Sequence, residues 1–234
     1  MISVIIPAYN HAVELPKTLE ALFAQDYTDI EIIVVNDGST DNTDEVIQPY
    51  LDSVRYIQQP NGGAPSARNN GFRHSKGEYV VFCDADLQFV PYALSHLLKA
   101  LSDHEGASYA YYSFTWGKKV FQGRPFDADL LRKTPYIHTS ALIRRADFPG
   151  FDERIKKFQD WDLWLTMLED GKTGYFLNEN LAYIEPRRAG EGISTWLPSF
   201  VYKIPWKKFG IRIKAIEKYE TAKAVIVAKY GLER

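Results

Sequence analysis

Residues 2–10 read ISVIIPAYN, and residues 30–43 read IEIIVVNDGSTDNT. Each stretch begins with a run of Ile and Val of strand length and ends in turn-forming residues, which is typical of a buried parallel strand. Similar runs occupy 54–57 and 79–83, and helical patterns lie at 12–24, 41–51, 64–75 and 91–102. Repeated β-α-β units of this length predict an α/β fold: a Rossmann-like, mostly parallel sheet with helices on both faces.

The composition limits the class of protein. A chain of 234 residues with 45% hydrophobic content has enough apolar surface for one sizeable core. Its net charge of −2 gives no global polycation, so we expect no nucleic-acid partner. The apolar run at the start is too short for a signal sequence, and no stretch reaches the roughly 18 apolar residues of a membrane span. We therefore expect a cytoplasmic protein.

The second half is less regular and ends in a basic tail. Strands are expected at 107–115 and 175–184, and helices at 160–169 and 207–230. From Lys203 to Arg234 there are nine Lys or Arg and three Glu, so the rest of the chain is acidic.

Polar and aromatic residues follow every predicted strand of the first half. These segments are 7–10 (PAYN), 36–43 (NDGSTDNT), 61–69 (NGGAPSARN) and 84–86 (DAD). The carboxyl ends of parallel strands form the ligand edge of such a sheet. An aromatic ring, carboxylates and an arginine suit a base and ribose, while helix N-termini and a cation suit phosphates. Taken singly, each segment also fits an ordinary turn or helix cap.

Taken together and in this order, the segments resemble the inverting family-2 glycosyltransferases of the glycosyltransferase-A fold. The resemblance is close over residues 2 to about 90 and looser to about 195. It implies a catalytic domain over 1–200, with a nucleotide-sugar-binding half at 1–115 and an acceptor half at 116–200. A basic helical tail over 201–234 follows.

The resemblance also implies roles in binding the nucleotide-sugar donor. Tyr9 stacks on the base, Asp37 binds the edge of the base, and Arg68 helps to fix it. Asp84 faces the ribose, and Asp86 ligates Mn²⁺ or Mg²⁺, which neutralises charge on the diphosphate. The other residues of the predicted donor site are Pro7, Ala8, Asn10, Gly38, Ser39, Asn61, Ala85 and Arg187. A uracil base is favoured, while thymine and guanine stay open.

The resemblance also implies that the acceptor half supplies the general base. Gln159-Asp160 matches the family's Glu-Asp pair with Gln in place of Glu, so Asp160 is expected to take the acceptor proton. Asp162 is the alternative base, and a helix cap is the structural alternative for Asp160. His138 and Trp161 are predicted to contact the acceptor.

The predicted reaction transfers one sugar from a nucleoside-diphosphate sugar, most simply a UDP-sugar, to a hydroxyl acceptor with inversion. A glycan or a lipid-linked acceptor in polysaccharide or glycolipid assembly fits this reaction. No Gln-x-x-Arg-Trp element follows, so the enzyme is expected to be non-processive. The competing classes are a sugar-nucleotide pyrophosphorylase and an inactive sugar-nucleotide or glycan-binding module. A pyrophosphorylase needs a Gly-rich loop with a basic residue after the first strand, and residues 7–10 have neither.

The tail has two interpretations. It packs an apolar side on the body (Phe209, Ile213, Ile216 and Val227), or it docks at the inner face of the membrane. Trp196, Trp206, Phe209 and the flanking lysines would make that peripheral contact.

Overall fold

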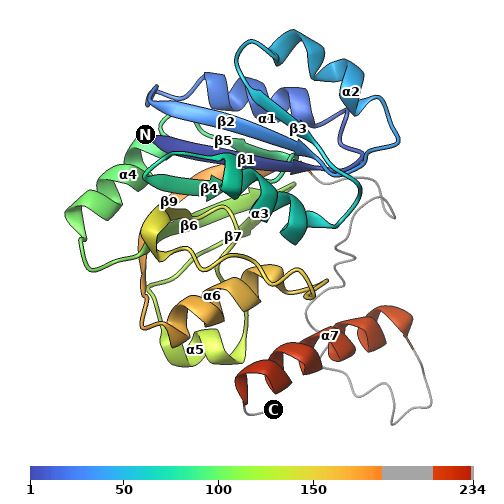
Figure 1. Ribbon diagram of the computed structural model, residues 1–234. Coiled ribbons are helices and arrows are strands. Elements are labelled where there is room, and N and C mark those ends of the chain that lie inside the picture. The colour runs from blue at the N-terminus through green and yellow to red at the C-terminus, as the bar shows by residue number, and fades with distance from the viewer. Residues whose placement is uncertain (186–212, 233–234) are drawn as a thin grey trace. The chain divides into compact units, whose positions relative to one another are not determined.

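The computed structural model describes residues 1–185 and 213–232 (Figure 1). The chain divides into two compact units, Met1–Glu185 and Pro186–Arg234. In the second unit the described residues form helix α7 (Lys214–Tyr230), which ends at Gly231 in the left-handed conformation (φ 60°). This confirms the predicted C-terminal helix over its described part. The predicted boundary at residue 200 lies outside the described residues.

The first half of the large unit follows the β-α-β pattern. Its elements are β1 (Ile2–Ala8), α1 (Leu15–Phe23), β2 (Ile30–Asn36), α2 (Thr43–Val46), a 3₁₀ turn (Gln48–Tyr50), β3 (Arg55–Gln58), α3 (Ala64–His74) and β4 (Tyr79–Phe82). The four strands are parallel in the order β3-β2-β1-β4. In the register, Ala8 lies opposite Asn36 and Asn36 lies opposite Gln58, so β1, β2 and β3 end at a common edge, toward which the parallel β4 also runs.

The second half extends the same sheet with mixed pairing. Its elements are β5 (Leu87–Phe89), α4 (Ala93–Asp103), β6 (Tyr109–Trp116), β7 (Lys119–Phe121), α5 (Ala128–Lys133), β8 (Leu142–Arg144), a 3₁₀ turn (Arg145–Asp147), α6 (Gln159–Glu169) and β9 (Gly174–Ile184). Strand β8 runs antiparallel between β4 and β6, and β9 is parallel to β6 and antiparallel to β5. The α/β class with helices around a largely parallel sheet is confirmed. The sequence did not predict β5, β7, β8 or α5.

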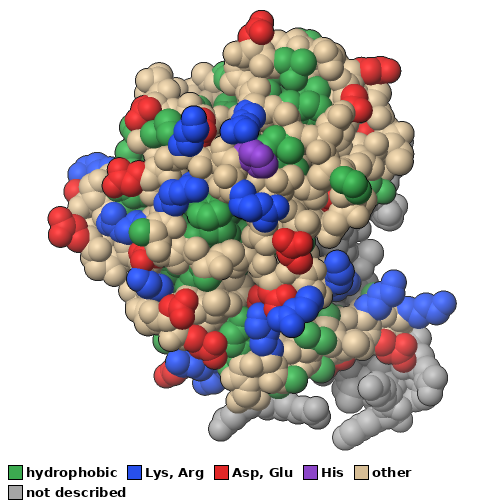
Figure 2. Space-filling view, in the orientation of Figure 1, with side chains coloured by type: hydrophobic (Ala, Val, Ile, Leu, Met, Phe, Trp, Pro, Cys, Tyr) green, Lys and Arg blue, Asp and Glu red, His purple; other side chains and the backbone are tan. Residues whose placement is uncertain are grey.

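Helices pack on both faces of the sheet. On one face, Ile2, Val4 and Ile6 of β1 belong to a core cluster that also contains Leu19 of α1 and Leu97 of α4. On the other face, Ile33 and Val35 of β2 pack with Ala67 of α3. The alternation of side chains along a strand produces this division. Figure 2 shows basic and acidic side chains interspersed on the face in view, in keeping with the small net charge.

No helix among residues 1–185 and 213–232 is long and apolar enough to cross a bilayer.

Helix α3 approaches the sheet closely because Gly71 has no side chain. A Cβ at Gly71 would lie 2.4 Å from Cγ2 of Ile5 and 3.2 Å from Cγ2 of Val35. We expect Gly71→Ala to lower the free energy of unfolding by about 1–3 kcal/mol through overpacking, more than the roughly 1 kcal/mol that Ala adds to a helix. Urea denaturation measures this. Gly106→Ala is the control, because nothing lies within 4 Å of a Cβ there. Equal stability of the two variants would contradict the close packing.

Candidate active site

The loops after β1 and β2 are joined at the carboxyl edge of the sheet. The N–H of Asn10 donates to Oγ of Ser39 (3.0 Å), and the N–H of Thr40 donates to Oδ1 of Asn10 (2.7 Å). Asn10 has a left-handed backbone (φ 56°), which Asn tolerates better than most residues. Tyr9, directly before it, is 44% exposed. The ring is thus accessible for the stacking predicted from the sequence.

Asp37 organises the loop that precedes α3. Its side chain is buried, and Oδ1 accepts hydrogen bonds from Nε2 of Gln59 (2.7 Å) and N–H of Gly62 (2.8 Å). Oδ2 accepts from the N–H of Gly63 (2.8 Å). Gly38 (φ 72°) also packs tightly here, since a Cβ would lie 2.8 Å from the backbone N of Asn61. Asp37 therefore shapes the loop, and its contact with a base stays a prediction.

A polar hollow of about 330 Å³ opens beside this loop, at the carboxyl ends of β2 and β3. Its lining residues are Asn36, Gly38, Ser39, Asp44, Gln58, Gln59 and Pro60. Only Gly38 and Ser39 of these belong to the donor site predicted from the sequence. Gln59 was missed because it lies before the glycine-containing motif, and its contact with Asp37 depends on the fold.

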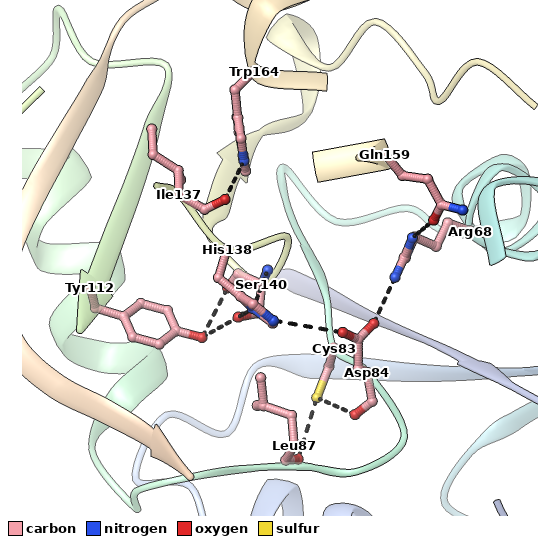
Figure 3. Close-up of polar contacts among 10 residues, drawn as sticks. All are labelled: Arg68, Cys83, Asp84, Leu87, Tyr112, Ile137, His138, Ser140, Gln159 and Trp164. Carbon is pink, nitrogen blue, oxygen red and sulfur yellow. Dashed lines mark hydrogen bonds and ion pairs between the residues drawn. The ribbon is translucent and has the colours of Figure 1, made fainter. Parts of the chain in front are cut away.

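Arg68 links three elements at the centre of the site (Figure 3). It belongs to α3 and is 5% exposed. Its Nη2 donates to Oδ1 of Asp84 (2.7 Å), and its Nη1 donates to Oε1 of Gln159 at the start of α6 (2.9 Å). The guanidinium carbon also lies 5.2 Å from the ring centroid of Phe151. The side chain predicted to fix the base thus joins the two predicted halves of the domain.

The Asp84-Ala85-Asp86 segment forms a turn between β4 and β5. The N–H of Leu87 donates to the carbonyl of Asp84 (3.0 Å), and Oγ1 of Thr18 in α1 donates to the buried carbonyl of Ala85 (2.8 Å). Burial by itself would raise the pKa of Asp84, but the Arg68 guanidinium and His138 outweigh it and hold the pKa below its usual value. Asp84 is therefore a permanent anion at neutral pH.

Asp160 lies in the first turn of α6, one residue after Gln159. The residue before the helix, Phe158, has φ 60° and ψ 36°, a conformation that is rare for a bulky side chain and is found mainly where the surroundings enforce it. Oδ1 of Asp160 accepts from the N–H of Trp161 (2.8 Å). Burial raises the pKa of Asp160, although that N–H, His138 and Arg68 oppose the rise. Asp162 is only 3% exposed, so Asp160 is the more accessible of the two candidate bases.

The predicted acceptor residues differ in their surroundings. Nε2 of His138 lies 3.8 Å from Oδ2 of Asp84, at the edge of the site. Trp161 is 1% exposed, and its indole N–H donates to the carbonyl of Leu131 at 2.6 Å. Trp161 thus packs in the interior against α5, and we do not include it among the acceptor-binding residues proposed below. Arg187 lies outside the described residues.

The carboxylates of the turn fit a hard divalent cation. The part of the chain that the structure describes has no cluster of three or more His, Cys, Asp or Glu side chains that could hold a metal. The two oxygens of Asp84 face Arg68 and His138, and the role of Asp86 as a ligand of Mn²⁺ or Mg²⁺ stays a prediction. One such ligand is sufficient when a diphosphate and water complete the shell.

Comparisons with known proteins identify the family. Residues 3–154 match the family described as Glycosyl transferase family 2. An uncharacterized glycosyltransferase of Rickettsia typhi is 31% identical over 204 residues, which are 77% of this chain and 62% of that protein. One of Escherichia coli K12 is 44% identical over 93 residues, which are 38% of this chain and 27% of that protein. The chain belongs to glycosyl transferase family 2, and it spans less than two thirds of the length of these relatives.

Solved structures share the fold. Staphylococcus aureus TarS in complex with UDP superposes with a TM-score of 0.69 at 21% identity, covering 79% of this chain and 60% of that one. The mannosyltransferase PcManGT from Pyrobaculum calidifontis, in complex with GDP-Man and Mn²⁺, gives 0.62 at 22% identity, covering 80% and 58%. The glycosyltransferase-A-like fold expected from the sequence is confirmed.

The raised pKa of Asp160 gives a stability prediction. A carboxyl whose pKa is higher in the folded than in the unfolded state lowers stability as pH rises through the interval between the two values. We therefore expect Asp160→Asn to raise the melting temperature at pH 7, because Asn cannot ionise and its oxygen still accepts from Trp161. The gain should shrink toward about pH 4, near the ordinary pKa of Asp. Thermal unfolding across this range measures it. A variant that is less stable than wild type at pH 7 would contradict the assigned environment of Asp160.

Proposed function

We propose that this chain transfers a single sugar from a nucleoside-diphosphate sugar to a hydroxyl acceptor, with inversion at the anomeric carbon. The observation that carries the proposal is the Arg68 bridge. It brings the Asp84-Ala85-Asp86 turn of the donor half next to Gln159-Asp160 of the acceptor half. A site for leaving diphosphate and a base for an incoming hydroxyl are then available at one edge of the sheet.

The reaction needs one proton transfer and one displacement. The carboxylate of Asp160 accepts the proton of the acceptor hydroxyl while the hydroxyl oxygen forms a bond to C1 of the sugar. The bond from C1 to the diphosphate oxygen breaks, and the diphosphate leaves with the electron pair. Attack opposite the leaving group inverts C1. The raised pKa of Asp160 favours proton uptake, since a base works best when its pKa is close to the working pH.

Asp84 and Asp86 have different tasks in this proposal. Asp84, fixed as an anion by Arg68, faces the ribose of the donor. Asp86 would hold Mn²⁺ or Mg²⁺, and the ion would neutralise charge on the diphosphate. Tyr9 stacks on the base, and Asp37 binds the edge of the base.

A UDP-sugar is the donor that we propose. The similar S. aureus TarS was solved with UDP and with UDP-GlcNAc, whereas PcManGT was solved with GDP-Man. The acceptor that we propose is a glycan or a lipid-linked sugar. Peripheral contact of the basic tail with the inner face of a membrane stays a prediction, because Trp196, Trp206 and Phe209 lie outside the described residues.

Donor binding should depend on the cation through Asp86. We expect UDP to raise the melting temperature of wild type in Mn²⁺ more than in EDTA, since a ligand selective for the folded state stabilises it by mass action. Asp86→Ala should lose the Mn²⁺-dependent part of the shift and the transfer activity while keeping its fold. The control is Asp103→Ala, at an exposed ion pair with Lys99 on α4. Full transfer by Asp86→Ala, or in EDTA, would contradict the assigned role of the cation.

The role of Asp160 as the general base is tested by the rate of sugar transfer. Asp160→Asn should lower kcat by on the order of 10²–10⁴ with little change in donor affinity, because the variant still binds the nucleotide but cannot take the proton. Single-turnover transfer and titration calorimetry with UDP separate the two effects. If Asp162→Asn is the severely impaired variant instead, the base is Asp162. UDP-sugar binding with no transfer in the wild type would favour a sugar-nucleotide-binding module.

A further inference from the structure

His138 lies in a segment whose backbone is held on both sides. The carbonyl of Ile137 accepts from Nε1 of Trp164 in α6 (3.0 Å), and Ser140 is fully buried two residues farther on. The imidazole packs 4.8 Å from the ring of Phe114 and keeps about 20% of its side chain exposed. The ring therefore has a fixed position and is partly exposed, and Figure 3 shows it between Ser140 and Asp84.

The hydrogen bonds around Nδ1 define which ring nitrogen carries the proton. The backbone N–H of Ser140 donates to Nδ1 of His138 at 3.3 Å. A backbone N–H is only a donor, so Nδ1 is the acceptor and the proton of the neutral ring is on Nε2. Oγ of Ser140 lies 2.7 Å from the same Nδ1, so the Ser140 hydroxyl donates a second hydrogen bond to that nitrogen.

Tyr112 donates the next hydrogen bond in this series. Its hydroxyl contacts Oγ of Ser140, and the residue is 5% exposed on β6. Burial raises the pKa of the Tyr112 hydroxyl, which keeps it protonated and able to donate. In this arrangement the Tyr112 hydroxyl donates to Oγ of Ser140, and the Ser140 hydroxyl donates to Nδ1 of His138. The serine hydroxyl thus accepts one hydrogen bond and donates another.

The opposite nitrogen faces the donor side of the site. Nε2 of His138 is 3.8 Å from Oδ2 of Asp84, too far for a direct hydrogen bond. It makes no hydrogen bond to the residues that the structure describes. Oδ1 of Asp84 accepts from Arg68, so Nε2 of His138 lies beside the other oxygen of a fixed carboxylate.

We propose that Tyr112 and Ser140 are positioning residues that hold His138 as the Nε2–H tautomer, and that this N–H donates a hydrogen bond to an oxygen of the bound sugar nucleotide. The contact rests on the proposed function, whereas the tautomer does not. It gives His138 a donor-side role in place of the acceptor contact predicted from the sequence.

The tautomer is measured by long-range ¹H–¹⁵N correlation on the full chain labelled with ¹⁵N-histidine, at about pH 8 where histidine is neutral. The chain has five histidines, and the signals missing from His138→Gln assign this one. We expect a protonated Nε2 in the wild type and a partial shift toward protonated Nδ1 in Ser140→Ala, which loses the hydroxyl donor but keeps the backbone N–H. Tyr112→Phe should shift less, because Ser140 keeps its own donor. Tyr111→Phe is the matched control, since its buried hydroxyl on the same strand donates to the carbonyl of Arg124 (2.8 Å).

Affinity provides the second readout. His138→Asn should bind the donor about tenfold more weakly, the usual scale for one lost hydrogen bond. His138→Gln should recover part of this affinity, since its amide N–H reaches nearer to the position of Nε2. Titrations with UDP and with a UDP-sugar locate the partner: weakening of both places it on the nucleotide, and weakening of the UDP-sugar alone places it on the sugar.

The outcomes separate this inference from the proposed function. A wild type that binds UDP but carries the proton on Nδ1 overturns the inference alone. Unchanged tautomer in both Ser140→Ala and Tyr112→Phe, or unchanged affinity in His138→Asn, also overturns it. A wild type with protonated Nε2 that binds no sugar nucleotide overturns the proposed function, and the donor contact with it.

Discussion

The buried guanidinium of Arg68 is the interaction on which the site depends. A buried cation is costly unless its charge and donors are satisfied, and here the partners come from two distant parts of the chain. Asp84 follows β4 and compensates the charge, whereas Gln159 begins α6 and accepts the hydrogen bond of Nη1, so both halves are needed to satisfy these two nitrogens. With Gln at 159 instead of the Glu typical of the family, the charge is matched by a single carboxylate, Asp84.

Two carboxylates near this guanidinium are driven in opposite directions. The pKa of Asp84 is lowered mainly by Arg68 against the effect of burial, whereas burial prevails at Asp160 and raises its pKa. Environments that separate the pKa values of neighbouring acids assign them different tasks. One carboxylate is suited to remain a fixed anion beside the donor, and the other to accept a proton during the reaction.

The sequence predicted the long elements and the chemistry-bearing turns, because buried strands and the Asp84-Ala85-Asp86 turn have local signatures. It did not predict β5, β7 and β8, whose three residues are too few for a periodic pattern, nor the short α5. The contacts of Arg68 with Gln159 and of Ser140 with His138 arise from packing between elements, so no local pattern indicates them. Trp161 illustrates the same limit, since its burial against Leu131 is decided by the fold.

The most direct test of this account is a crystal structure with UDP and Mn²⁺, with the ion located by its anomalous scattering. The account predicts an Mn²⁺ peak at the carboxylate of Asp86 and the base beside Tyr9, with Asp84 still paired with Arg68. The diphosphate should lie on the side of the turn that faces Asp160. A nucleotide bound away from the carboxyl edge of the sheet, or an ion held elsewhere than at Asp86, would contradict it.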